Sequence, residues 1–128
     1  MVLQCVVVGV GGALGAIGRY LFGLIPVAGV FPLTTLCING IGAILIGFVT
    51  VFLGECFPMH PNMLLFWKTG VCGGFTTFST FSLETVQLLG QGKYWVAGAY
   101  AVLSVILCLA GVFLGFLLGK VSAAALLR

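Results

Sequence analysis

Four long apolar segments, separated by short stretches of proline, glycine and polar residues, make up almost the whole chain. A bilayer core about 30 Å thick needs about 20 apolar residues for each helix that crosses it. The expected spans, about residues 2–24, 33–54, 63–90 and 94–119, leave room only for short loops. The sequence therefore predicts one all-α integral membrane domain, residues 1–128, with four transmembrane helices.

Charged residues are scarce, with five Lys or Arg, two Asp or Glu and one His, for a net charge of +3. Proteins that bind nucleic acid carry clustered basic residues, and this chain has no such cluster, so nucleic acid is not an expected partner. No nucleophile–base pair and no metal-ligand set can be assembled, so an enzyme is not expected. The odd number of cysteines, without CxxC spacing, predicts neither a disulfide framework nor a zinc site.

The third span contains a segment, Gly70–Glu84 (GVCGGFTTFSTFSLE), that suits an uninterrupted membrane helix poorly. The adjacent glycines Gly73 and Gly74 weaken a helix, and a dense run of hydroxyl groups and phenylalanines follows them. Broken helices at the middle of a bilayer are a recurring way of building ion sites. The sequence predicts that the glycine pair breaks the third helix near mid-membrane and that the function lies there.

Two stripes of side chains at helical spacing follow the glycine pair. One contains Phe75, Phe78 and Phe81, and the other contains Thr77, Thr80, Glu84 and Gln87. The phenylalanines could be lipid-facing or packing bulk, and threonines in spans often bond back to their own helix. A carboxylate inside a span is costly unless it is paired or wet, which makes Glu84 a functional candidate.

Polar residues in the other spans leave two interpretations open. Asn39, on one stripe with Thr35, is either a pore group or a hydrogen bond between helices, worth about 1 kcal/mol. Arg19 is either an anchor at the membrane interface, which the residues alone favour, or a cation at the mouth of an anion pathway. The four-residue spacing of Gly11 and Gly15 predicts close helix packing.

Basic residues are almost evenly divided between the two expected sides of the membrane. Lys68, Lys120 and Arg128 share one side with both termini, and Arg19 and Lys93 lie on the other. The asymmetry of Lys and Arg sets orientation, so three against two favours insertion both ways over a single orientation set by other cues. Four small helices also leave little room for a pore. An antiparallel homodimer is therefore expected.

Three segments together resemble the Fluc (CrcB) family of fluoride channels in its single-domain bacterial form. They are GGALGAIGRY (Gly11–Tyr20), LCINGIGAILIG around Asn39, and GVCGGFTTFSTFSLE (Gly70–Glu84), and the resemblance covers all four spans in order. It implies a passive, fluoride-selective channel that exports F⁻ down its electrochemical gradient across the bacterial plasma (inner) membrane. It also implies an antiparallel dual-topology dimer with two pores and a central structural Na⁺.

The resemblance further implies roles for individual residues. Phe78 and Phe81 would contact fluoride through their ring edges, and Asn39 would be the pore asparagine. Arg19 would be the vestibule cation, and Glu84 would be the acidic residue after the GGFTTFSTFS signature of residues 73–82. The hydroxyl groups along the pore would belong to Thr77, Ser79, Thr80, Tyr100 and Ser104. The backbone carbonyls of Gly73 and Thr76, from both subunits, would hold the sodium ion.

Three other functions remain open from the residues. A small dual-topology multidrug transporter also has four spans, but it needs an acidic residue in the first span, and none is present there. Proton-coupled transport of a small ion could use Glu84. A structural membrane subunit without transport activity is the third alternative.

Overall fold

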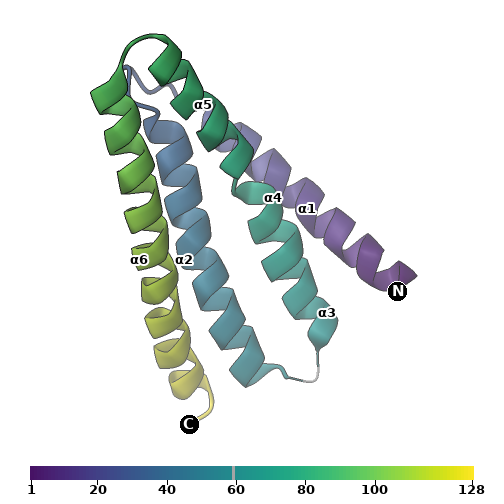
Figure 1. The fold of residues 1–128 in the computed structure, drawn as a ribbon. Coiled ribbons are helices and arrows are strands. Elements are labelled where there is room, and N and C mark those ends of the chain that lie inside the picture. The colour runs from purple at the N-terminus through teal and green to yellow at the C-terminus, as the bar shows by residue number, and fades with distance from the viewer. Residues whose placement is uncertain (59) are drawn as a thin grey trace.

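Helices joined by short connections form the computed structural model, which describes residues 1–58 and 60–128. Three helices are long: α1 (Val2–Gly23), α2 (Leu33–Cys56) and α6 (Tyr94–Leu126). The third expected span consists of shorter pieces: α3 (Pro61–Leu64), the π-helix η1 (Leu65–Cys72), α4 (Gly73–Phe75) and α5 (Phe78–Gly90). Figure 1 shows η1 and α4 rising to the break, with α5 continuing beyond it.

The three long helices are each apolar and long enough to cross a bilayer, with mean hydropathies of 1.7, 2.3 and 2.8. In contrast, α5 has 13 residues, fewer than the roughly 20 that a crossing needs. A fourth crossing therefore requires the parts on both sides of the break. The last helix continues to Leu126, beyond the expected end of the span at about residue 119.

The break in the third segment lies after the glycine pair and not at it. Gly73 and Gly74 have helical conformation in α4, whereas Thr76 (φ −76°, ψ 157°) and Thr77 (φ −149°, ψ 108°) are extended. The prediction that the glycines break the helix is therefore wrong. β-Branched threonines favour extended backbone, and side-chain hydrogen bonds to Thr77 replace the lost helical bonds.

Close packing against α1 explains the glycines that flank the break. A Cβ atom on Gly74 would lie 3.0 Å from the Cα atom of Gly12, and one on Gly11 would lie 3.0 Å from the Cα atom of Gly70. Gly11 and Gly15 are the buried residues of α1. The small-residue spacing thus brings two backbones together, as the sequence predicts.

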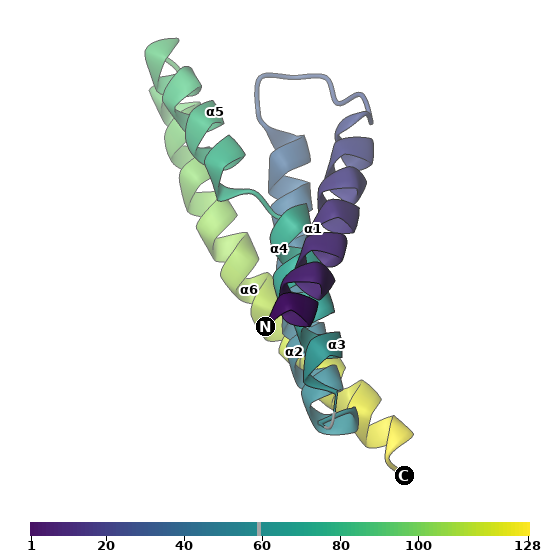
Figure 2. The ribbon, with the colours of Figure 1, turned by 90° about the vertical axis from the view of Figure 1, so that its right-hand side faces the viewer.

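A second glycine contact joins α2 to α6, which lie side by side in Figure 1. A Cβ atom on Gly47 would lie 3.2 Å from the Cα atom of Gly115. Farther along the same pair of helices, Leu36 and Tyr100 pack with Leu88 of α5 in a small buried cluster. Figure 2 shows α5 and the adjoining part of α6 diverging from α1. The break and its polar residues lie where these two arms separate.

Candidate functional site

The side chain of Asn39 on α2 holds the extended backbone at Thr77. The amide Nδ2 of Asn39 donates to the carbonyl oxygen of Thr77 (3.1 Å), and the N–H of Thr77 donates to Oδ1 of Asn39 (2.7 Å). An asparagine amide has two N–H donors, and this pair of bonds uses one of them. Asn39 is therefore an interhelical contact that still retains a donor.

The hydroxyl of Thr77 caps the N-terminus of α5. The N–H of Thr80 donates to Oγ1 of Thr77 (3.2 Å), which is the N-cap bond of the helix. The same hydroxyl donates to Oγ1 of Thr80 (2.9 Å) and lies 3.3 Å from the hydroxyl oxygen of Ser79. Three hydroxyl groups of the predicted site are thus gathered at the first turn of α5.

The break also releases two backbone carbonyls. In a continuous helix, each N–H bonds to the carbonyl four residues earlier, so Thr77 would bond to Gly73 and Thr80 to Thr76. Both N–H groups instead donate to side chains, to Asn39 and to Thr77 respectively. The carbonyl oxygens of Gly73 and Thr76 therefore lose their helical partners. Gly73 is exposed, with nothing nearer than 4.0 Å to the position that a Cβ would take.

The carboxylate of Glu84 on α5 joins three helices. The hydroxyl of Thr35 on α2 donates to Oε1 (2.9 Å), and the hydroxyl of Tyr100 on α6 donates to Oε2 (2.7 Å). Tyr100 is completely buried and Thr35 is 5% exposed. Both oxygens of the carboxylate therefore accept hydrogen bonds from hydroxyl groups of neighbouring helices. The costly carboxylate expected from the sequence is thus paired with hydroxyl donors.

The two candidate pore phenylalanines, Phe78 and Phe81, lie one turn apart on α5. The rings of Phe78 and Phe81 have centroids 5.4 Å apart at 44°, and Phe81 also lies 5.2 Å from the ring of Tyr100. Phe78 is 79% exposed, whereas Phe81 is half-buried against the cluster around Tyr100. One ring is therefore held within the protomer, and the other projects from it.

Ser104 lies one turn beyond Tyr100 on α6 and is 6% exposed. Its hydroxyl oxygen is buried and has no hydrogen-bond partner among the described residues. A buried hydroxyl without a partner carries a desolvation cost of about 1–3 kcal/mol. This hydroxyl therefore has unused capacity to donate to a ligand.

A cavity of about 330 Å³, mostly apolar in its lining but with several polar side chains, lies between α1, α2 and the start of α5. Arg19 and Tyr20 line it from α1, and four threonines from the facing elements complete its polar surface: Thr34, Thr35, Thr77 and Thr80. Arg19 is thus brought to the same cavity as the hydroxyl groups at the break.

A second polar cavity, of about 450 Å³, lies at the same end of the molecule. Its polar lining includes Thr34, Glu84, Gln87, Gln91 and Lys93. Thr34 lines both cavities, and Thr35 of the first donates a hydrogen bond to Glu84 of the second. The two cavities therefore meet at the Thr35–Glu84 contact.

A sequence profile described as CrcB-like protein, Camphor Resistance (CrcB), matches residues 6–116. The chain belongs to the CrcB family. This result confirms the resemblance identified in the sequence, and it makes the chain a multi-pass membrane protein with bacterial and archaeal homologues.

Several relatives of the CrcB chain carry the name "Fluoride-specific ion channel FluC". The protein of Pyrococcus horikoshii is 41% identical over 87% of this chain and 91% of the relative. The protein of Ruminiclostridium cellulolyticum is 46% identical over 94% and 95%, and that of Rhizobium meliloti is 46% identical over 87% and 91%. The name describes a channel and not an enzyme, in agreement with the prediction that the chain is not an enzyme.

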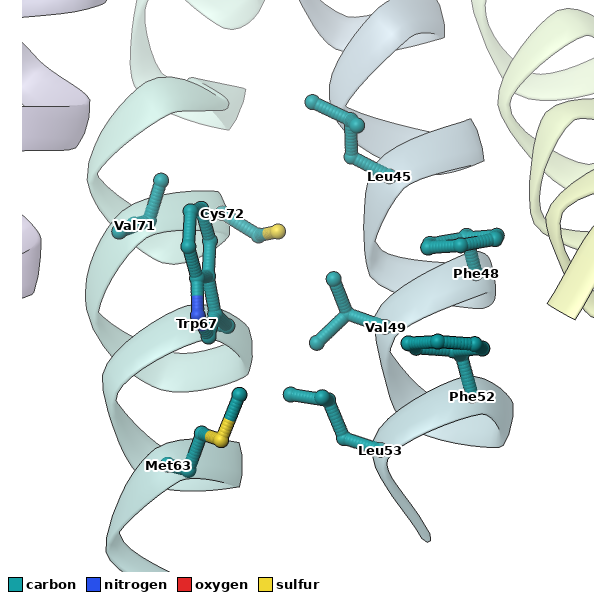
Figure 3. Close-up of a pocket in the computed structure, with 9 residues that line it drawn as sticks. All are labelled: Leu45, Phe48, Val49, Phe52, Leu53, Met63, Trp67, Val71 and Cys72. Atoms are coloured by element: carbon teal, nitrogen blue, oxygen red, sulfur yellow. The ribbon is translucent and has the colours of Figure 1, made fainter. Parts of the chain in front are cut away.

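A third cavity of the CrcB chain, of about 320 Å³, is apolar and lies apart from this site. Figure 3 shows it between α2 and η1, with Val49 and Leu53 facing Trp67, Cys72 and Met63. None of its lining side chains carries a charge. Apart from the indole N–H of Trp67 and the thiol of Cys72, its lining side chains are hydrocarbon or thioether groups, and it is not part of the candidate pathway.

Thr35 is the functional candidate that sequence reasoning left without a role. It shares a stripe with Asn39, and both contact the third segment, at Glu84 and Thr77 respectively. The four-residue spacing of these two polar residues in an apolar span was the available signal. The partners could not be read from that spacing, because they are 49 and 38 residues away in the chain.

Proposed function

We propose that this CrcB chain is a fluoride-selective passive ion channel. The observation that carries the proposal is 41–46% identity, over nearly the whole chain, to proteins named fluoride-specific ion channels. Hydrogen fluoride is a weak acid that crosses membranes uncharged and ionises in the cytoplasm. The negative interior of the bacterial plasma (inner) membrane then drives F⁻ outward through the pore, so export needs no ATP.

The polar groups around the break would replace the hydration shell of the ion. Conduction requires sites strong enough to dehydrate an ion and weak enough to release it. Hydroxyl and amide donors meet this condition better than a buried lysine. The free amide N–H of Asn39 and the unpaired hydroxyl of Ser104 are available donors. Thr77, Ser79 and Thr80 would continue this polar track along α5.

Aromatic ring edges would supply the apolar part of the pathway. The edge of a phenylalanine ring carries partial positive charge, so Phe78 and Phe81 can face an anion without binding it tightly. Arg19, in the cavity with Thr77 and Thr80, would raise the anion concentration at the vestibule. The hydroxyls of Thr35 and Tyr100, now donated to Glu84, could turn toward a passing anion.

The protomer would work as an antiparallel dual-topology homodimer with two pores. Phe78 projects from the protomer, and the carbonyls of Gly73 and Thr76 are free of helical partners, as a contact with a second copy requires. Oxygen ligands suit hard cations. Carbonyls of Gly73 and Thr76 from both subunits would hold a structural Na⁺, whose charge favours a nearby anion.

Proton-coupled export of a small ion is the second candidate function. Glu84 favours it, because this carboxylate lies at the contact between the two cavities. A multidrug-type transporter is less compatible, since α1 contains no Asp or Glu to bind a cationic substrate.

Fluoride efflux from liposomes that contain only the purified protein tests these functions. A potassium gradient with valinomycin sets the membrane potential, and chloride serves as the control ion. A channel should give fluoride efflux that follows the potential and persists without a pH gradient. Efflux that requires a pH gradient would support proton coupling instead, and equal fluoride and chloride fluxes would refute selectivity. Normal fluoride tolerance in cells lacking the protein would favour a structural subunit.

A further inference from the structure

Lys93 is the basic residue of the second polar cavity, at the turn between α5 and α6. Gly92 has a φ of 74°, a left-handed conformation that glycine adopts without cost. This turn allows the N–H of Lys93 to donate to the carbonyl of Leu88 (2.9 Å). The side-chain Nζ then donates to Oε1 of Gln91 (2.7 Å). Both bonds orient the lysine, which is half-buried.

The charge of Lys93 offsets that of Glu84 within the same cavity. Glu84 is the acidic residue among the described residues that line it, and Lys93 is the basic one. Without Lys93, the cavity would hold a net negative charge, which repels anions. The remaining polar lining, Thr34, Gln87 and Gln91, consists of neutral donors and acceptors that water or a hydrated anion can contact.

This cavity lies directly beside the Arg19 cavity, because the two share a lining residue. Thr34 lines both cavities, and the Thr35–Glu84 hydrogen bond of 2.9 Å joins their walls. Lys93 therefore lies in the cavity next to that of Arg19. The two cations stand on either side of one threonine-lined wall.

We propose that Lys93 is a second pore-mouth cation, which concentrates small hydrated anions in this cavity and so sets the rate at which fluoride enters or leaves the pore. This inference rests on the proposed channel function. In water, a unit charge about 10 Å away changes the local concentration of a monovalent anion roughly twofold. Removal of the charge should therefore have a modest effect, and reversal a larger one.

The test measures fluoride efflux from liposomes with wild type, Lys93→Gln, Lys93→Glu and Lys93→Arg at two ionic strengths, set with potassium glutamate. At about 10 mM the Debye length is roughly 30 Å, and at about 1 M it is roughly 3 Å. At low ionic strength, Lys93→Gln should slow efflux about twofold and Lys93→Glu about fourfold. Lys93→Arg should recover most of the rate lost in Lys93→Gln. At high ionic strength the differences should vanish.

Lys120→Glu is the matched control, because it makes the same charge change on an exposed part of α6 far along the chain from this cavity. It should leave efflux unchanged at both ionic strengths. Each variant is reconstituted as purified protein, so an effect of charge on membrane insertion alters the yield and not the rate.

Equal efflux by Lys93→Glu and wild type at low ionic strength would overturn the inference. So would a loss that persists at high ionic strength, because that loss would come from the Gln91 contact or the turn and not from charge. If the wild-type protein itself releases no fluoride, the proposed channel function is wrong. That result differs from equal efflux by wild type and Lys93→Glu, which overturns the role of Lys93 alone.

Discussion

The side-chain amide of Asn39 replaces helical hydrogen bonds at Thr77. Within a bilayer, an unpaired backbone group costs several kcal/mol, and Asn39 pairs both the N–H and the carbonyl of Thr77. This one side chain therefore allows the third segment to leave helical geometry without exposing the backbone at Thr77. The same side chain retains a donor for a ligand.

Asn39→Leu should destabilise the protein by about 2–6 kcal/mol, because two buried backbone groups would lose their partners, at roughly 1–3 kcal/mol each. Denaturation in detergent micelles measures this change. Thr50→Val on the same helix is the control, since the hydroxyl of Thr50 bonds only to Ile46 of its own helix (2.7 Å). Equal unfolding midpoints for the two variants would show that Asn39 does not support the break.

Phe78→Ile and Phe81→Ile should each slow fluoride efflux roughly tenfold, which corresponds to about 1.4 kcal/mol. Isoleucine keeps the apolar bulk but lacks the positive ring edge. The elution volume of the purified protein should not change. Phe113→Ile, at an exposed position distant along α6, should leave efflux unaltered. If both α5 variants conduct fluoride as wild type does, the ring-edge mechanism is wrong.

At the scale of elements, the sequence predicted that the third segment is broken but misplaced the break. Glycine propensity pointed to Gly73 and Gly74, yet both are helical, and Gly74 packs closely against Gly12 of α1 while Gly73 is exposed. The actual position depends on Asn39, 38 residues away. Helix propensity depends on neighbouring residues and carries no information about such a distant partner. For the same reason, the stripe that Thr35 shares with Asn39 was visible in the sequence, but not the meeting of Thr35 and Tyr100 at Glu84.

The bounds of the long helices were easier to predict than the interior of the third segment. Apolar runs bounded by proline and glycine predict α1 and α2 closely. The π-helical segment Leu65–Cys72 has no counterpart in the prediction, because its composition is that of an ordinary apolar helix. Gly70 of this segment packs against Gly11 of α1. The π-helical geometry therefore accompanies a contact between helices, which a local sequence pattern does not show.

Gly15→Ala should separate α1 from the third segment. The added Cβ would lie 2.8 Å from the backbone nitrogen of Phe75 and would also collide with the carbonyl of Val71. Overpacking of this kind costs about 1–3 kcal/mol, measurable as a lower unfolding midpoint in detergent. Gly9→Ala, on the same helix with nothing within 4 Å of the new Cβ, is the control. Equal midpoints would show that α1 can move away without cost.

At the scale of the whole molecule, the protomer carries features that only a second copy would complete under the proposed function. The α5 arm diverges from α1 (Figure 2), and its Phe78 remains 79% exposed. The carbonyls of Gly73 and Thr76, released by the break, have lost the bonds that a membrane interior requires. A partner in the opposite orientation would bring two breaks together at one depth.

The near balance of basic residues allows a decisive test of dual topology, because two sets of substitutions shift it in opposite directions. Ala28→Lys with Lys120→Gln and Arg128→Gln changes the count from two against three to three against one, in favour of the end that holds Arg19. Glu55→Lys changes it to two against four, in favour of the other end. Each variant should insert mainly in one orientation, since Lys and Arg asymmetry sets topology.

Fluoride tolerance of cells without another fluoride exporter measures the outcome. An antiparallel dimer needs both orientations, so each biased variant alone should restore tolerance poorly, whereas the two expressed together should restore it to the wild-type level. Glu55→Gln, which removes the same carboxylate without adding a basic residue, is the control and should behave as wild type. If each biased variant alone gives full tolerance, the two subunits do not need opposite orientations, and the pore must be built from copies that lie in the same sense or from one protomer.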